Sequence, residues 1–380
     1  MKDKSQSMDK IWLNAPALSN NAKSKMREAL DGGWIAPNGP YSKELIGLLE
    51  EYTGKYVALI SSATAGLHLA LKALNIGEGD VVLTPDLSFI ASLNPIRYVN
   101  ATPVLIDSES ETWNMCPGTT EEAIQKLIKQ GRKPKAIIVV HLFGVPADMY
   151  AFLRISEEYE IPIIEDAAES FMSEVNGKPT GSLGDVGVYS FNGNKLLALS
   201  GGGAVISDDK RVIQHIHKMA NQSRENAVHY QHEEIGFNYQ FSDLLAALGV
   251  GEWECLREKR ERKAEIDAFY RKKLETLGFQ FQQVNDNALS SCWLPSVLLP
   301  VELTEYRDDL VGYLRDHNID SRPVWKPMRQ QPLNQQLEVF GGNTSAEIFR
   351  RGICLPAGVG LKNSDLERIV EVIEHFFKNL

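Results

Sequence analysis

The chain has 380 residues and a formal net charge of −10 at pH 7, and 43% of its residues are hydrophobic while 24% are charged. These values are typical of a folded globular protein and exclude a disordered or fibrous chain. The acidic balance provides no basic surface for nucleic acid or for an anionic membrane, so a phosphate-bearing ligand must be bound by local groups.

The N-terminal residues 1–10 are polar and lack the apolar core of a signal peptide, and a second methionine, Met8, offers an alternative start. No apolar run approaches the ~20 residues needed to cross a bilayer. The four cysteines are too few and too widely spaced for a disulfide framework. We therefore expect a cytoplasmic protein that binds neither nucleic acid nor a membrane.

Short β-rich segments recur from the first third of the chain onward, and several are apolar throughout, as strands covered on both faces must be. They comprise residues 56–61, 81–85, 103–107, 136–141, 161–166, 186–191 and 204–207. Helix-like segments lie between them, including residues 65–75, 119–130 and 147–159. This alternation predicts an α/β fold with a mainly parallel sheet and helices on both of its faces.

A long helical pattern follows, from Ser242 to Leu277, and Gly278 ends it. Beyond it, short strand-like segments mix with helices, of which residues 363–377 are the clearest. A chain of this length exceeds the size at which one hydrophobic core stops growing. We predict a large domain over residues 1–255, including an N-terminal arm, and a smaller α/β domain over residues 256–380 that is carried on the long helix.

The first predicted strand ends in small residues, Ser62-Ala63-Thr64-Ala65-Gly66, just before a helix. In open parallel sheets, ligands bind beyond the carboxyl ends of the strands. Backbone N–H groups and the Thr64 hydroxyl at a helix start can bind an anion, which the helix dipole stabilises further. A plain helix cap explains this motif equally well when it is taken alone.

The segment 161–166 ends in two acids, Glu165 and Asp166. A carboxylate that emerges from an apolar strand is destabilised by several kcal/mol unless it meets a cation. We therefore expect a cation beside Asp166. Solvated acids at a helix cap are the alternative.

Lys195 follows another strand in the motif Asn192-Gly193-Asn194-Lys195, with Ser190 before it and glycines at 201–203 behind it. The Ser190 hydroxyl can add to an anion site, and the glycines let the backbone pass close to whatever Lys195 holds. For a single lysine, an exposed turn position is the simpler explanation.

One cofactor accounts for all three strand ends. Pyridoxal phosphate has an aldehyde that needs a lysine, a pyridine nitrogen that needs a carboxylate to stay protonated, and a phosphate that needs small donors at a helix start. Lys195, Asp166 and the pair of Thr64 and Ser190 supply these groups. The sequence therefore predicts a pyridoxal phosphate site.

The sequence resembles the DegT/DnrJ/EryC1/StrS family of nucleotide-sugar aminotransferases, which have the aspartate aminotransferase fold, fold type I of the pyridoxal phosphate enzymes. The resemblance covers almost the whole chain and rests on the motifs GGWIAPNGP, SSATAGLHLAL, SFIAS, IEDAAES, YSFNGNKLLALSGGG, QSREN, GFNYQFSD and SRPVWKPM. Within the family, the chain looks most like enzymes that aminate C4 of UDP-4-keto-6-deoxy-N-acetylglucosamine for bacterial glycan biosynthesis.

The resemblance implies roles for individual residues around the cofactor. Lys195 would bind the cofactor aldehyde and move protons, and Asp166 would be the partner of the pyridinium. Phe89 would stack on the ring, and Glu169 would lie near the 3-hydroxyl of the cofactor.

The resemblance also implies the phosphate site and the assembly. Ala63, Thr64 and Ser190 would bind the cofactor phosphate. Asn238 would reach the phosphate of the neighbouring subunit's cofactor, which implies a homodimer with active sites shared across the interface. Taken without the family, Asn238 is a turn asparagine.

The expected substrates are L-glutamate and a UDP-linked keto-sugar. Ile35 and Ala36 would line the sugar's side of the cofactor, and Arg224 and Lys326 would bind the nucleotide phosphates. Taken singly, each of these two cations is explained as well by a solvated loop position. The chain departs from the family at Arg329, where close relatives often have histidine.

Several other functions are compatible with part of the pattern. They are amination at C3 or of another nucleotide-linked keto-sugar, and a regulator that binds the cofactor or a sugar nucleotide without turnover. A C3 dehydratase of the same fold is disfavoured because the family's dehydratases replace the lysine by histidine. A dehydrogenase is disfavoured because no G-x-G-x-x-G motif lies between an early strand and helix. The pairs His215/His217 and His229/His232 lack a convergent cysteine or carboxylate set, so we expect no metal site.

Overall fold

The computed structural model of the chain describes residues 9–380. The alternative start at Met8 and most of the polar N-terminal segment lie outside these residues. Within residues 9–380, no helix is both long and apolar enough to cross a membrane.

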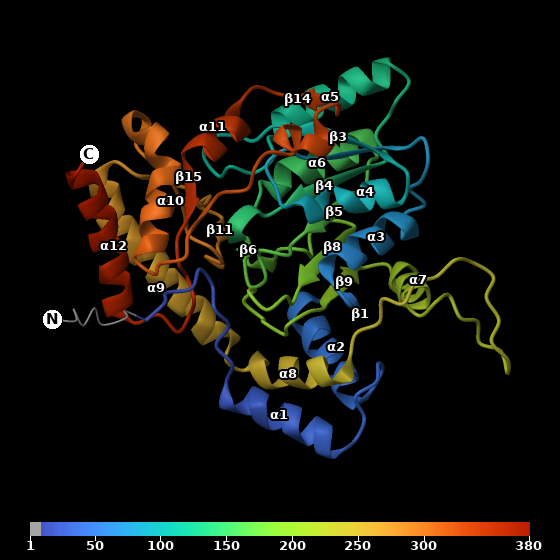
Figure 1. The fold of residues 1–380 in the computed structure, drawn as a ribbon. Helices are drawn as coiled ribbons and strands as arrows, with labels where there is room; N and C mark the ends of the chain where they lie inside the picture. Colours follow the sequence, from blue (N-terminus) through green and yellow to red (C-terminus); the bar gives the residue numbers. More distant parts are fainter. Residues whose placement is uncertain (1–8) are drawn as a thin grey trace.

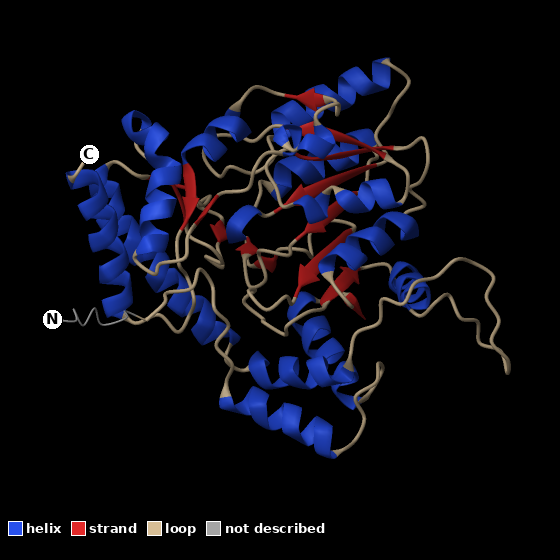
Figure 2. Cartoon of the chain, in the orientation of Figure 1, coloured by secondary structure: helices blue, strands red, loops and turns tan. Residues whose placement is uncertain are grey.

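An eight-stranded sheet forms the centre of the larger part of the molecule (Figures 1 and 2). All neighbouring strands pair in parallel except β9, which is antiparallel to both β1 and β8. The mainly parallel sheet of the sequence prediction is therefore confirmed. In spatial order the strands are β1 (Tyr56–Ile60), β9 (Gly203–Ser207), β8 (Val186–Ser190), β5 (Ile163–Asp166), β4 (Ala136–Val140), β2 (Val81–Pro85), β3 (Thr102–Ile106) and β14 (Val339–Phe340).

Helices cover both faces of this sheet, which explains why its strands are apolar throughout. Successive residues of a strand point to opposite faces. In β4, Ile138 and Val140 belong to the core on the face of α3 (Ala63–Ala73) and α7 (Lys210–Ala220). Ile137 and Val139 pack instead with α5 (Pro117–Lys129) and α6 (Met149–Tyr159).

Two helices occupy the stretch in which the sequence predicted one long helix, so that prediction is wrong at its centre. α8 (Asp243–Trp253) packs on α1 (Asn20–Asp31) and α2 (Pro40–Thr53). α9 (Leu256–Leu274) begins in the same core as α8, at Leu256, and buries Ile266, Tyr270 and Leu274 in a separate core with the C-terminal elements. Because α8 and the rest of α9 belong to different cores, the chain turns between them.

A second, four-stranded antiparallel sheet lies in the C-terminal part of the chain. Its strands, in order, are β10 (Gln280–Phe281), β12 (Ser296–Leu298), β15 (Gly352–Cys354) and β13 (Arg322–Pro323). It shares a core with α9, α10 (Arg307–Asp316) and α12 (Asn363–Lys378). Segments of the two parts of the chain also contact each other. β14, from the C-terminal part, joins the large sheet, and Ile11, from the N-terminal part, pairs with Ile319. The division of the chain at residue 255 remains a proposal.

The remaining elements are short and serve mainly as connections. A three-stranded sheet has the order β11 (Ala288–Leu289), β6 (Glu174–Val175) and β7 (Lys178–Pro179). Two further helices are α4 (Asn94–Tyr98) and α11 (Thr344–Arg351). The 3-10 turns are η1 (Ile90–Ser92), η2 (Leu142–Gly144), η3 (Glu275–Leu277), η4 (Val301–Tyr306), η5 (Met328–Gln330) and η6 (Pro332–Asn334).

Candidate active site

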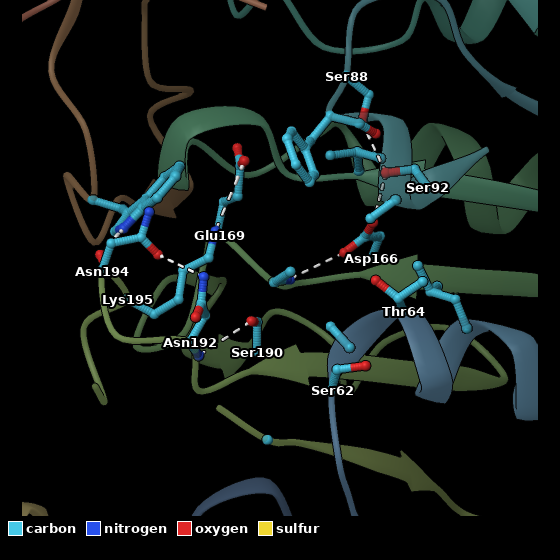
Figure 3. Close-up of a pocket in the computed structure, with 18 of the residues that line it drawn as sticks. Ser62, Thr64, Ser88, Ser92, Asp166, Glu169, Ser190, Asn192, Asn194 and Lys195 are labelled. Carbon is cyan, nitrogen blue, oxygen red and sulfur yellow. Dashed lines mark hydrogen bonds and ion pairs between the residues drawn. The ribbon is translucent and has the colours of Figure 1, made fainter. Parts of the chain in front are cut away.

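A cavity of ≈ 220 Å³ lies at the carboxyl ends of β5 and β8 and at the start of α3 (Figure 3). Residues that end or follow each of the three strands singled out in the sequence line this cavity. The carboxyl ends of the strands are the expected place for a ligand in an open parallel sheet. Seven of the twelve predicted site residues line it: Ala63, Thr64, Phe89, Asp166, Glu169, Ser190 and Lys195.

The start of α3 forms one side of the cavity. Ser62 caps the helix, because its hydroxyl accepts a hydrogen bond from Ala65 N at 3.1 Å. The N–H groups of Ala63 and Thr64 belong to the first turn, which has no intrahelical acceptors for them. With the hydroxyls of Thr64 and Ser190, which line the same cavity (Figure 3), they make up a set of donors that can bind an anion, called the anion cup below.

Gly202 lets the chain pass beside this cup. Its φ is +99°, and a Cβ there would lie 1.9 Å from a ring carbon of Phe241. Only glycine fits such a position without strain. The backbone path along the pocket wall therefore requires glycine at position 202, while Gly201 has open space around it.

Asp166 ends β5 and is 4% exposed. Its Oδ2 accepts a hydrogen bond from Ser92 Oγ at 2.7 Å, and its Oδ1 accepts one from Ala168 N at 3.2 Å. Burial raises the pKa of Asp166, and these two hydrogen bonds and the charge of Lys195 oppose the rise. A cationic ring nitrogen at this carboxylate would offset the cost of burying it.

Lys195 projects into the same cavity, and its side chain is 12% exposed. Its Nζ lies 3.6 Å from the ring centroid of Trp293 and 3.9 Å from Oε1 of Glu169. Burial lowers the pKa of Lys195, while the charges of Glu169 and Asp166 raise it. Burial thus favours the neutral amine, which is the form that reacts with an aldehyde.

Glu169 is held rigidly beside Lys195. Its Oε2 accepts a hydrogen bond from Phe143 N at 2.7 Å, and its Oε1 accepts one from Trp325 Nε1 at 3.3 Å. Burial raises the pKa of Glu169, and the charge of Lys195 opposes that rise. A buried acid of raised pKa can share a proton with a hydroxyl or an amine in the cavity.

Aromatic rings line the same cavity. Phe89 lines it together with Trp325, and the centroids of these two rings are 5.7 Å apart. A flat ring between an anion cup, a buried carboxylate and a lysine is the arrangement that pyridoxal phosphate requires, so the residues present fit this cofactor.

The residues of the pocket that received no role from the sequence include Ser92, Trp293 and Trp325. Ser92 lies in the SFIAS motif, four residues after Ser88, whose Oγ is 2.8 Å from Ser92 Oγ. The four-residue spacing of these two serines in the motif was the feature of the sequence that could have indicated Ser92. The two tryptophans come from the C-terminal part of the chain, and their place in the pocket follows only from the packing of that part on the large sheet.

Five predicted site residues lie outside this cavity. Ile35 and Ala36 are exposed in the loop between α1 and α2, and Asn238 is exposed beside Asn221. Arg224 is exposed and stacks 4.4 Å from the ring centroid of Tyr230. Lys326 is exposed and follows Trp325 in the chain.

Arg329 is the position at which the chain differs from close relatives in the family, and its side chain contacts two buried aspartates. Its Nε donates to Asp86 Oδ2 at 2.6 Å, and its Nη2 is 3.3 Å from Asp107 Oδ1. Asp86 follows β2 and Asp107 follows β3. Arg329 therefore fastens the segment that carries Trp325 to the carboxyl ends of two strands.

The fold and the cavity together define a pyridoxal phosphate-dependent aminotransferase. Residues 16–374 match the model of the DegT/DnrJ/EryC1/StrS aminotransferase family. The chain belongs to this family, and it is a pyridoxal phosphate-dependent sugar aminotransferase.

Known proteins of similar sequence or structure agree with this assignment. The chain is 40% identical over 374 residues to EpsN of Bacillus subtilis strain 168, provisionally named a pyridoxal phosphate-dependent aminotransferase, with 97% of this chain and 96% of EpsN covered. It is 34% identical over 374 residues to GDP-perosamine synthase of Escherichia coli O157:H7, covering 98% and 100% of the two chains. The crystal structure of the aminotransferase TlmJ from Streptoalloteichus hindustanus superposes with a TM-score of 0.90 at 26% identity, covering 98% and 100%.

Proposed function

We propose that this enzyme transfers the amino group of L-glutamate to C4 of a UDP-linked 4-keto-6-deoxy-N-acetylhexosamine, for bacterial glycan biosynthesis. The observation that carries the catalytic part is Lys195, buried beside Glu169 and facing an anion cup in one cavity. The choice of sugar and carbon rests on the resemblance of the WIAP motif (residues 34–37) and the NGNK motif (residues 192–195) to those of the C4 enzymes.

The proposed roles of the residues follow from their contacts. Pyridoxal phosphate supplies an electron sink that lets an amino group move between two carbonyl compounds. Lys195 would hold the cofactor through its amine, and the free amine would carry a proton as general acid and base. Asp166, fixed by Ser92 and Ala168, would keep a proton on the ring nitrogen. Glu169 would orient the hydroxyl side of the ring.

We propose that the start of α3 binds the phosphate group of the cofactor. The N–H groups of Ala63 and Thr64 and the hydroxyls of Thr64 and Ser190 would donate to the cofactor phosphate, and the positive end of the helix dipole would stabilise it. This local site explains how a chain of net charge −10 can hold a phosphate-bearing ligand.

A homodimer with shared active sites accounts for an exposed loop. Residues 222–238 project from the body of the protein after α7 (Figure 1), and three apolar side chains on this loop are strongly exposed: Val228 (107%), Tyr230 (77%) and Ile235 (79%). Exposed apolar side chains gathered in one segment are typical of an interface. Asn238 and Arg224 lie on this loop, so a second copy that covers it would contact them, and we propose that they reach the cavity of that copy.

We place the nucleotide site at two exposed cations beside the cavity and the loop. Arg224 and Lys326 are exposed cations, and Lys326 adjoins Trp325 at the cavity. A diphosphate would attract both side chains, and Ile35 and Ala36 would contact the sugar. A cytoplasmic location also remains a proposal, and the four free cysteines suit a reducing compartment.

A GDP-linked keto-sugar is the second candidate substrate. It is favoured by the 34% identity to GDP-perosamine synthase over nearly the whole of both chains. The two candidates require the same lysine, carboxylate and anion cup, and they differ only in the residues that contact the nucleotide and sugar.

The experiment is a panel of UDP-linked and GDP-linked keto-sugars, with the keto group at C3 or C4, each incubated with glutamate and the holoenzyme. Mass spectrometry and NMR of the products identify the aminated sugar and carbon. We expect the UDP-linked 4-keto sugar to be aminated at C4, with one 2-oxoglutarate formed for each amino sugar. Exclusive turnover of a GDP-linked or 3-keto sugar would overturn the substrate assignment.

A further inference from the structure

Lys263 is a buried lysine that lies outside the cavity. It belongs to α9 and is 2% exposed. Its Nζ donates hydrogen bonds to Asn14 Oδ1 at 3.0 Å, to the Trp293 carbonyl oxygen at 2.9 Å and to the Ala357 carbonyl oxygen at 2.7 Å. One amine thus joins α9 to the N-terminal arm, the segment before β12 and the segment after β15.

A second set of hydrogen bonds connects Lys263 to the cavity. Asn14 Nδ2 donates to the Asn194 carbonyl oxygen at 2.7 Å, and Trp293 Nε1 donates to the same oxygen at 2.8 Å. Asn194 precedes Lys195, whose Nζ lies 3.6 Å from the centroid of the Trp293 ring. The backbone of Trp293 is therefore held by Lys263, and its indole nitrogen is held by the residue next to Lys195.

The environment of Lys263 is poorly explained by stability alone. Its three acceptors are uncharged oxygens, and a buried lysine with such partners is less stabilising than an apolar side chain of similar size. Burial lowers the pKa of Lys263 to about 7. The thiol of Cys292 opposes this lowering, and the charge of Lys195 contributes to it.

We propose that Lys263 is a positioning residue, which holds the Trp293 ring over the amine of Lys195 and fastens the N-terminal arm to the same wall of the cavity. This inference rests on the proposed function of Lys195. The ring attracts the ammonium form of Lys195 through a cation–π contact and covers the amine. Release of the ring therefore makes the amine both less often protonated and more accessible.

The test measures the acetylation rate of Lys195 by acetic anhydride in the cofactor-free, full-length protein, by peptide mass spectrometry. Lys263→Gln, Asn14→Ala and Trp293→Leu should each raise this rate by about three- to tenfold, the range expected for losing one cation–π contact. The double variant Lys263→Gln/Trp293→Leu should react no faster than Trp293→Leu, because Lys263 acts through the ring. Asn14→Ala changes no charge and keeps the test valid if Lys263→Gln does not fold.

Lys259, one turn earlier on α9, provides the matched control. It also binds the N-terminal arm, through the Ala17 carbonyl oxygen at 2.8 Å, but its other partner is Glu252. Lys259→Gln should leave the Lys195 rate unchanged. The proposal is overturned by unchanged rates in both Lys263→Gln and Asn14→Ala, by multiplicative effects in the double variant, or by an equal acceleration in Lys259→Gln.

The readout separates this inference from the proposed function. It needs no cofactor, so the positioning role can fail although borohydride still fixes pyridoxal phosphate to Lys195. If another lysine is found to bind the cofactor, the predicted rates can still be observed, but the contact then has no role in the reaction.

Discussion

Asp166 is the residue whose charge matters most in this account. Its carboxylate is buried and fixed by Ser92 and Ala168. Asp166→Asn keeps the shape of the side chain but removes the negative charge that would keep the ring nitrogen of the cofactor protonated. We therefore expect kcat/KM for glutamate to fall by about 10²- to 10³-fold. Steady-state kinetics at equal cofactor content check this.

Ser92→Ala is the control for Asp166, because it removes one hydrogen bond and leaves the charge. It should cost less activity than Asp166→Asn. Near-normal turnover in the asparagine variant would show that Asp166 is only structural.

Glu169 should set the pH at which Lys195 reacts. Its negative charge stabilises the ammonium form and thereby raises the pKa of Lys195 against the effect of burial. Glu169→Gln removes that charge, so the pKa of Lys195 falls. Cofactor uptake needs the neutral amine, and its rate rises with pH through this pKa. Stopped-flow absorbance of uptake by the cofactor-free protein should therefore show a profile displaced to lower pH, and a displacement to higher pH would contradict the assigned interaction.

The sequence could predict the residues that carry chemistry but only some of those that surround them. Asp166 ends β5 and Lys195 lies in the turn after β8, and the carboxyl ends of neighbouring parallel strands share one edge of a sheet. Trp293 lies ~100 residues further along, so its place over Lys195 depends on how the C-terminal part packs. The sequence around a buried tryptophan does not indicate which side chain its ring will contact.

At the scale of elements, Arg329 links the segment that carries Trp325 to β2 and β3. Its partners Asp86 and Asp107 are buried, and burial raises the pKa of Asp86 while Arg329 lowers it. Arg329→Met leaves two buried carboxylates without their cation, so the free energy of unfolding should fall by about 3 kcal/mol. Denaturant unfolding of the cofactor-free protein measures this.

A double variant tests whether Arg329 acts through Asp86. Asp86→Asn/Arg329→Met removes one of the unpaired charges and should be more stable than Arg329→Met alone. A double variant that is less stable, by the sum of the single effects, would mean that the pair contributes nothing.

The elements were predictable where their patterns were local. β4 and β5 are apolar because helices cover both faces of the sheet, and the predicted segments match them within three residues at either end. The break between α8 and α9 was missed because both flanking segments are helical, and only their different packing partners separate them. β14 has two residues, too few for any pattern, and it is a strand only because β3 offers it an edge.

For the whole molecule, the proposed sharing of sites between subunits predicts complementation. Asn238→Ala should weaken cofactor binding by about 1 to 3 kcal/mol, the usual cost of removing a hydrogen bond to a charged acceptor. Mixing it with Lys195→Ala should restore activity, because one of the two sites in the heterodimer then contains neither substitution.

The control mixes Lys195→Ala with Asp166→Asn. Both residues line the same cavity of one chain, so every site in this heterodimer carries a lesion and activity should stay low. Equal activity in the two mixtures, once subunit exchange has been demonstrated, would count against a shared site.

The central claim, that Lys195 binds pyridoxal phosphate in this cavity, is tested most directly by borohydride reduction of the holoenzyme followed by peptide mapping. The holoenzyme should be yellow, lose its visible band on reduction, and yield one cofactor-bearing peptide with the modification on Lys195. Modification of another lysine, such as the buried Lys263, or a protein that takes up no cofactor, would contradict the account.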